Sequence, residues 1–376
     1  MGHYEINKNL AQSVFDCDIY SNMNPIDMVK IHYGADNEKD KVAVFTTDFV
    51  WRRIVYSQKN STELKAISSE EIGGGLMPLA GITTETNWQY DNYIYTVSQT
   101  PDSKVCRFQY QPSINQLILH SKFSVYGALD LHDISYKQGG SGELWLADLS
   151  GGIFVCEKNG AIKRTITQFY SGSTAIPISH ITRLEVSNTG NQLVGFIDKF
   201  QQRMVIAKWE NNKLNAITMI ELTAASRLTD VGINYDSEFY FTDESLNCLY
   251  KFNELGEYIC TLNDPAWFKY PSRLTNIAWD RPSMPAIEFY VANRWTSENG
   301  IRRYLLGSDV VDITANQAGL SYLNLNYRLM GDSYVKIDIL KNGVLKYTKT
   351  YGWQQSGLRT EVVNFNTLGI DRKSVV

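Results

Sequence analysis

Acidic side chains recur at the ends of short apolar runs, and carboxylate oxygens are the ligands that calcium prefers. Four such runs end at Asp48, Asp148, Asp198 and Asp243, and a fifth ends at Asn293, which has an amide oxygen in place of a carboxylate. If the runs are strands around an axis, these side chains form a ring that could hold a divalent cation. An aspartate at this position also suits hydrogen bonding to the backbone of the next turn. We favour this structural role and keep the metal site as the alternative.

Two histidines precede predicted inner strands, in Leu131-His132-Asp133 and Ser179-His180-Ile181. With Asp148, His132 and His180 could hold zinc or supply a general base at the mouth of a central channel. No further histidine repeats the pattern, and the sequence contains neither Gly-x-Ser-x-Gly nor His-Glu-x-x-His. Partly buried histidines are mostly structural. We therefore assign no catalytic residue, and these three remain candidates.

Large aromatic residues stand in or beside the connections between predicted strands: Trp51, Trp88, Trp267, Tyr270 and Trp295. Aromatic rings on rigid loops suit stacking on sugars or contact with a protein partner. Packing between neighbouring sheets uses the same residue types, so both roles stay open. We name these five residues as the binding candidates.

The elements that carry these residues repeat along the chain. Six strand-like runs end at residues 48, 98, 148, 198, 243 and 293, which are 45 or 50 residues apart. Each follows a shorter apolar run and precedes a run that often carries Arg or Lys. A glycine-containing turn and a fourth run complete the clearest units. Four short antiparallel strands bury both faces when such units stack around an axis. We predict an all-β six-bladed propeller over residues 24–311.

The repeats resemble those of the NHL family. The resemblance rests on residues 274–279, the strand Glu288-Phe289-Tyr290-Val291-Ala292-Asn293, and residues 300–304. The unit over residues 227–262 matches best. The first two units depart from the pattern, because residues 88–90 are inserted and Ser98 replaces the aspartate. The resemblance covers about three-quarters of the chain; it implies a propeller and leaves function open.

The period stops after Gly307. Alternating strands are predicted at residues 322–329 and 334–340, and Asn342-Gly343 predicts a hairpin to residues 344–350. With a further strand over residues 358–365, this region resembles the immunoglobulin-like module of flagellar hook-capping and other secreted bacterial proteins. We expect residues 312–376 to form a small β-sandwich that lacks its last strand. Either the chain is trimmed there, or the open edge accepts a strand from a partner.

The N-terminal segment, residues 1–23, precedes the first unit. Tyr4-Glu5-Ile6 or residues 14–20 could close the ring by pairing with the last blade. The start of the chain lacks the basic and apolar regions of a signal peptide, and no window reaches the length of a membrane span. Five cysteines include no Cys-x-x-Cys pair, so their pairing stays open.

Composition narrows the function classes. The net charge of −4 disfavours nucleic acid as a partner, and with it an RNA-binding propeller. We expect a non-catalytic binding or scaffold protein that engages protein or glycan through a propeller face. The resemblance of the C-terminal region implies an extracellular or cell-surface location, with a cytoplasmic one as the alternative. The alternative function is a metal-dependent lyase or hydrolase. No cofactor is expected on the first interpretation, and zinc or calcium on the second.

Overall fold

The computed structural model describes much of the chain. The described residues are 12–13, 25–33, 41–48, 51–58, 61, 63–71, 78–87, 91–99, 103–138, 141–187, 192–223, 225–234, 237–262, 273–279, 287–294, 300–306, 310–318, 322–329, 333–341, 344–354 and 357–364. Every regular element within these ranges is a β-strand. The described part of the chain contains no helix long and apolar enough to cross a membrane.

Three four-stranded antiparallel sheets follow one another along the first half of the chain. The first comprises β2 (Pro25–His32), β3 (Val42–Asp48), β4 (Arg53–Gln58) and β5 (Lys65–Ser68). The second comprises β6 (Leu79–Asn87), β7 (Asp91–Ser98), β8 (Lys104–Gln111) and β9 (Gln116–Ser124). The third comprises β10 (Leu131–Lys137), β11 (Glu143–Asp148), β12 (Gly152–Cys156) and β13 (Ile162–Ile166).

Two further sheets continue the series. One contains β16 (Ile181–Val186), β17 (Leu193–Asp198), β18 (Arg203–Glu210) and β19 (Lys213–Glu221). A hairpin of β14 (Gln168–Ser171) and β15 (Thr174–Pro177) extends it, because Tyr170 pairs with Asn215 in parallel. The sequence analysis did not anticipate this hairpin. The next sheet contains β20 (Leu228–Ile233), β21 (Phe239–Asp243), β22 (Cys248–Phe252) and β23 (Tyr258–Leu262).

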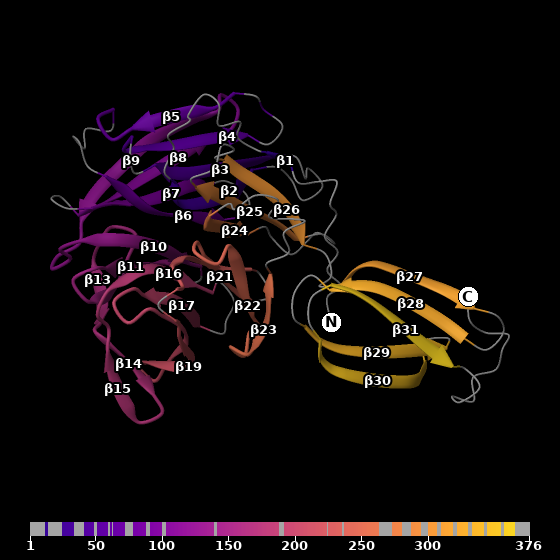
Figure 1. Ribbon diagram of the computed structural model, residues 1–376. Helices are drawn as coiled ribbons and strands as arrows, with labels where there is room; N and C mark the ends of the chain where they lie inside the picture. The colour runs from indigo at the N-terminus through magenta and orange to yellow at the C-terminus, as the bar shows by residue number, and fades with distance from the viewer. Residues whose placement is uncertain are drawn as a thin grey trace.

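These five sheets are evenly placed blades of a β-propeller (Figure 1). The first strand of each blade packs against the first strand of the next, in the order β2, β6, β10, β16 and β20. A further sheet has the order β1-β26-β25-β24, and its β24 (Arg273–Trp279) lies against both β20 and β2. It also contains β25 (Ile287–Arg294), β26 (Gly300–Leu306) and β1 (Gln12–Ser13).

The hydrophobic core lies between the blades. Phe45 and Tyr56 of the first blade pack with Tyr110 of the second, at ring-centroid distances of 5.0 to 6.2 Å. Both faces of a middle strand are covered by neighbouring blades, and all seven residues of β3 are buried. This explains why the sequence shows continuous apolar runs there rather than an alternation of polar and apolar residues.

The predicted strand ends are confirmed in the five blades: β3, β7, β11, β17 and β21 end at Asp48, Ser98, Asp148, Asp198 and Asp243. Two predicted hairpins are also confirmed. Gly160 has a φ of 90° and Gly256 a φ of 75°, values that glycine adopts without strain. Each hairpin then leads into the outer strand of its blade.

The chain ends contribute other strands. Gln12 and Ser13 pair with Arg303 and Arg302 of β26. The two segments named above for ring closure, residues 4–6 and 14–20, lie outside the described residues. The C-terminal strands form a three-stranded and a two-stranded sheet. They are β27 (Val310–Ala318), β28 (Tyr322–Leu329), β29 (Ser333–Lys341), β30 (Val344–Gln354) and β31 (Gly357–Asn364).

Candidate functional site: the turn face of the propeller

One face of the propeller carries the turns between the second and third strands of each blade. The connections from each outer strand to the next inner strand reach the same face, because the strands of a blade alternate in direction. We call this the turn face. It includes the β3–β4, β11–β12, β17–β18 and β21–β22 turns.

A repeated backbone hydrogen bond joins these segments. The residue after each second strand donates its N–H to a carbonyl just before the inner strand of the same blade. The pairs are Gln99 with Pro78 (3.0 Å), Leu149 with Asp130, Lys199 with His180, and Glu244 with Arg227 (2.9 Å each). The turn face is thus held by the same contact in four blades.

Asp148 strengthens this connection in the third blade. Its side chain is fully buried, and one carboxylate oxygen accepts N–H bonds from Leu129 at 2.7 Å and Asp130 at 3.0 Å. The other oxygen accepts from the N–H of Ser150 at 2.8 Å and from its hydroxyl. One carboxylate therefore fixes both the incoming connection and the β11–β12 turn.

Asp243 has the same role in the fifth blade. One oxygen accepts N–H bonds from Arg227 at 3.1 Å and from Ser245 and Leu246 at 3.0 Å. The hydroxyl of Tyr250 donates to the other oxygen at 3.4 Å. The carboxylate again joins the connection before the blade to the turn within it.

Arginines complete the pattern in the other two blades. Asp198 accepts from the hydroxyl of Ser179 at 2.9 Å and from the Arg203 guanidinium at 2.7 Å. Asp48 accepts a hydrogen bond from Nε of Arg53 at 3.2 Å, and Nη2 of the same guanidinium forms an ion pair with it at 3.1 Å.

The contacts of Asp148, Asp198 and Asp243 are those of the structural role that we favoured, since donors from turns, from the connections between blades and from Arg203 bind their oxygens. Asn293, in β25, is described only in its backbone. Within the described ranges, no group of three or more His, Cys, Asp or Glu residues is placed to hold a metal ion.

His132 and His180 occupy different environments. The Gln99 amide nitrogen lies 2.9 Å from Nε2 of His132, which therefore accepts a hydrogen bond. Burial, with the positive charges of Arg183 and Lys199, lowers the pKa of His132 to about 4. His180 is exposed and stacks on Phe200, with ring centroids 5.4 Å apart. Among the described residues, no hydrogen bond joins His132, His180 or Asp148 to another of the three; Asp148 acts on His132 only through its charge.

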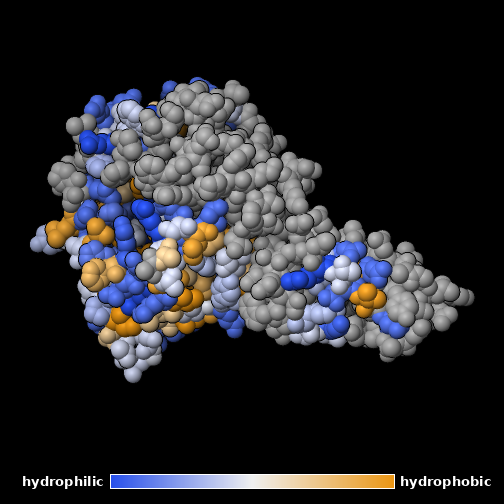
Figure 2. Space-filling view, in the orientation of Figure 1, coloured by the Kyte–Doolittle hydropathy of each residue, from blue (hydrophilic) through white to orange (hydrophobic). Residues whose placement is uncertain are grey.

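Large apolar side chains project from the turn face. Their exposed fractions are 54% for Trp51, 91% for Tyr126, 66% for Leu129, 69% for Phe200 and 49% for Leu246. All five lie in turns or inter-blade connections. In Figure 2, hydrophobic residues form separate patches among hydrophilic ones on the propeller.

Only Trp51 of these five was a sequence candidate. Trp88, Trp267, Tyr270 and Trp295 lie outside the described residues. The sequence does contain a pattern that could have identified two of the others. Phe200 follows Asp198 by two residues, and Leu246 follows Asp243 by three. Trp51 likewise follows Asp48 by three. An apolar residue in such a turn is the feature that the sequence reasoning missed.

A polar network lies in the inner strands close to this face. Near the start of the first strand of each of the five blades, and of β24, the pairing with the next strand shifts register. The residue two positions after the first paired one lies at this shift. The equivalent residues are Asp27, Gly81, Asp133, Arg183, Asp230 and Asn276. Charged side chains are thus concentrated at equivalent positions near the start of the inner strands.

No family model matches the chain, and no curated protein matches its sequence. Solved structures resemble it in fold. The PQQ-bound aldose sugar dehydrogenase of Streptomyces coelicolor is 9% identical with a TM-score of 0.55, covering 81% of this chain and 99% of that one. The calcium-binding protein regucalcin of Agrobacterium tumefaciens is 10% identical, with a TM-score of 0.50 and coverages of 79% and 95%.

The WD40 repeats of RRP9 are also similar, at 10% identity and a TM-score of 0.50, covering 80% of this chain and 100% of that chain. These neighbours include an enzyme, a calcium-binding protein and a repeat domain. At such low identity, the likeness concerns the fold alone. The chain is a β-propeller.

Proposed function

We propose that this protein is a non-catalytic binding protein that engages a protein or glycan through the turn face. On this proposal, the sheet of β24 to β26 is a sixth blade in an NHL-like propeller. The C-terminal sheets then form an immunoglobulin-like sandwich that serves sorting or assembly. The proposal places the protein outside the cell or at its surface.

The observation that carries the proposal is the set of exposed apolar side chains on the turn face. The turn face exposes the aromatic rings of Trp51, Tyr126 and Phe200, and aromatic residues are enriched among those that contribute most to binding. Their turns are held by buried carboxylates, so a ligand meets residues that are already positioned. Preorganised contacts lose less conformational entropy on binding than mobile ones.

The lyase or hydrolase alternative has less support. The low pKa of His132 makes its imidazole a weak base, and its Nε2 accepts the Gln99 amide. His180 is exposed and stacks on Phe200, and no hydrogen bond among the described residues joins it to His132.

The test compares two sets of exposed residues. A variant with Trp51→Ala, Tyr126→Ala and Phe200→Ala removes aromatic surface from the turn face. The control variant, Ile114→Ala with Leu255→Ala, removes residues that are 51% and 60% exposed in the β8–β9 and β22–β23 turns, on the opposite face. Binding is measured against an array of defined oligosaccharides and a displayed peptide library.

We expect the turn-face variant to lose at least about tenfold in affinity for the best probe, because interface aromatics each contribute on the order of 1 kcal/mol or more. The control should bind as the wild type does. Equal binding by the turn-face variant, with loss in the control, would show that the opposite face is the binding surface.

A further inference from the structure

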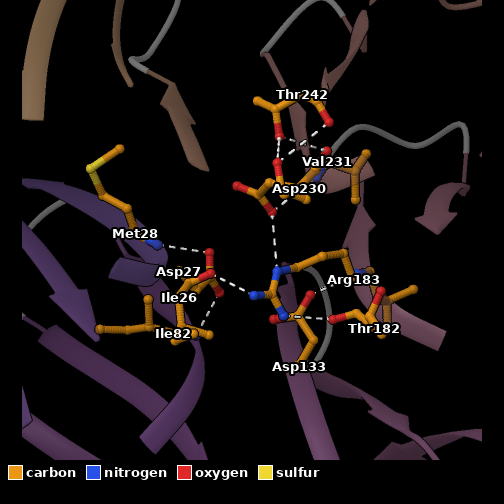
Figure 3. A network of polar contacts seen from close by, with 12 residues as sticks. Ile26, Asp27, Met28, Ile82, Asp133, Thr182, Arg183, Asp230, Val231 and Thr242 are labelled. Atoms are coloured by element: carbon orange, nitrogen blue, oxygen red, sulfur yellow. Dashed lines mark hydrogen bonds and ion pairs between the residues drawn. The ribbon is translucent and has the colours of Figure 1, made fainter. Parts of the chain in front are cut away.

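Arg183 crosses the centre of the propeller from the fourth blade to the first. Its Nη2 donates to the carbonyl of Ile26 at 2.5 Å, and its Nη1 donates to that of Thr182 at 2.6 Å. Its Nε lies 3.7 Å from an oxygen of Asp230 in the fifth blade. Figure 3 shows this guanidinium with Asp27, Asp133 and Asp230 around it.

The carboxyl groups near Arg183 outnumber it. Asp27, Asp133 and Asp230 are each at most 7% exposed, and Glu185 stands two residues further along β16. Arg183 contacts Asp230 as well, so it does not belong to Asp27 and Asp133 alone. Ionising both Asp27 and Asp133 would place two like charges in one buried site, and a buried carboxyl group in this situation binds a proton instead. One of the two therefore needs a proton.

Hydrogen bonds indicate whether Asp27 or Asp133 carries the proton. Both oxygens of Asp27 accept backbone N–H bonds, from Met28 and from Ile82, each at 2.7 Å. Oδ2 of Asp133 accepts the N–H of Leu184 at 2.6 Å, whereas its buried Oδ1 meets no donor. Figure 3 shows both carboxyl groups beside the same guanidinium, and although burial raises the pKa of Asp27, a hydrogen bond with Asp133 is among the contacts that lower it. Two carboxylates cannot bond to each other, but a carboxylic acid can donate to a carboxylate.

We propose that Oδ1 of Asp133 carries a proton that it shares with the carboxylate of Asp27, so that this acid–carboxylate pair joins the first and third blades. The pair is a pH-sensitive contact at the centre of the propeller. Losing its proton places two negative charges side by side and weakens the packing of the blades.

The surrounding charges agree with this assignment. Burial is the main cause that raises the pKa of Asp133 well above 3.8, and the negative charge of Asp27 adds to it. Burial likewise raises the pKa of Asp27 and that of Glu185. The positive charge of Arg183 partly opposes the increase in the pKa of Asp133 and of Asp27. The proton therefore remains on the pair above the pH at which an exposed aspartate ionises.

Several charged groups stand on the described elements packed against the pair. They are Asp27 and the buried Lys30 of β2, His132 and Asp133 of β10, Arg183 and Glu185 of β16, Asp230 of β20, and Lys199 of the β17–β18 turn. On β6, Glu85 is bound to Tyr95, Arg107 and Lys158 instead. The side chains of β24 lie outside the described residues.

The consequence for stability has a definite sign. The folded protein holds protons that the unfolded chain releases above pH 3.8, the ordinary pKa of aspartic acid. The stabilisation from the pair is complete below this pH, and it decreases as the pH rises toward the raised folded pKa. The contribution of the pair to stability therefore falls with each pH unit above 3.8 until the folded pKa is reached, and is constant beyond it.

Two variants of the pair have opposite expected effects. Asp133→Asn replaces the acid by an amide whose NH₂ can donate to Asp27 at any pH. We expect its melting temperature to match the wild type at pH 5 and to exceed it by at least about 3 °C at pH 9. Asp27→Asn is the matched control. It places an amide NH₂ against the N–H groups of Met28 or Ile82 and should lower the melting temperature at both pH values.

An equal loss at pH 5 and pH 9 in Asp133→Asn would overturn the proposal. The infrared spectrum of the wild-type protein supplies a readout that needs no variant. We expect a carbonyl band from a protonated carboxyl group at pH 7, with the downward shift in D₂O that marks an exchangeable proton. A wild-type spectrum without that band also contradicts the proposal.

Discussion

Three of the strand-ending aspartates, Asp148, Asp198 and Asp243, accept hydrogen bonds from groups that are far apart in the sequence. Asp148 contacts Leu129 and Asp130 on one side and Ser150 on the other. At the level of single residues, the Asp148 carboxylate therefore holds the connection before the blade against the β11–β12 turn. Both of its oxygens must be hydrogen-bond acceptors to do so. This requirement distinguishes it from Asp133, where one oxygen meets no donor.

Asp148→Asn tests this requirement. The amide places an NH₂ group against backbone N–H donors, so one set of hydrogen bonds is lost in a buried site. We expect a decrease of about 2 kcal/mol in the free energy of unfolding, measured by urea denaturation at pH 7. Glu254→Gln, in the exposed β22–β23 turn, is the control and should leave the urea midpoint unchanged. A stable Asp148→Asn protein would mean that the turn donors find other acceptors.

At the level of elements, inner strands approach one another closely where a side chain is missing. Gly81 of β6 faces β10. A Cβ atom there would lie 2.5 Å from Cα of Asp133 and 2.7 Å from the nitrogen of Ile134. Because these are backbone atoms, an added methyl group must push two strands apart.

Gly81→Ala should therefore destabilise the propeller by more than about 2 kcal/mol, as overpacking of a rigid core does. The measurement is again the free energy of unfolding in urea. Gly152→Ala is a matched control in β12, because its Cβ would meet nothing closer than 3.7 Å, an ordinary contact distance. If both variants lose the same stability, the close approach at Gly81 is not the reason.

Some strands and exposed residues could be predicted from the sequence, and others could not. The ends of β3, β11 and β17 were found because a recurring polar residue closes each apolar run. The hairpin of β14 and β15 was missed, since its pairing with β19 involves residues that are distant in the sequence. Trp51 was found as an aromatic residue in a connection, whereas the exposed apolar residues Leu129 and Leu246 were not.

At the level of the whole molecule, the binding and enzyme interpretations differ in their need for a metal ion. The described aspartates of the turn face are occupied by turn donors, so we expect chelator-washed protein to retain no stoichiometric zinc or calcium. Elemental mass spectrometry on untagged protein provides the measurement. About one zinc or calcium ion per chain would instead favour the lyase or hydrolase alternative. Alanine variants of His132, His180 and Asp148 would then be the next step.

The sequence alone determined the β-strand repeat and most strand boundaries, because burial between blades requires apolar runs and each turn requires polar or glycine residues locally. It also marked the aspartates that end the strands. Only the tertiary structure decided what those aspartates contact and brought Asp27, Asp133, Arg183 and Asp230 together from four blades. The reason is physical: hydrogen bonds, proton sharing and exposure depend on distances in space. The partners of Asp148 in the preceding connection are 18 and 19 positions away, and the central charged residues are about fifty positions or more apart.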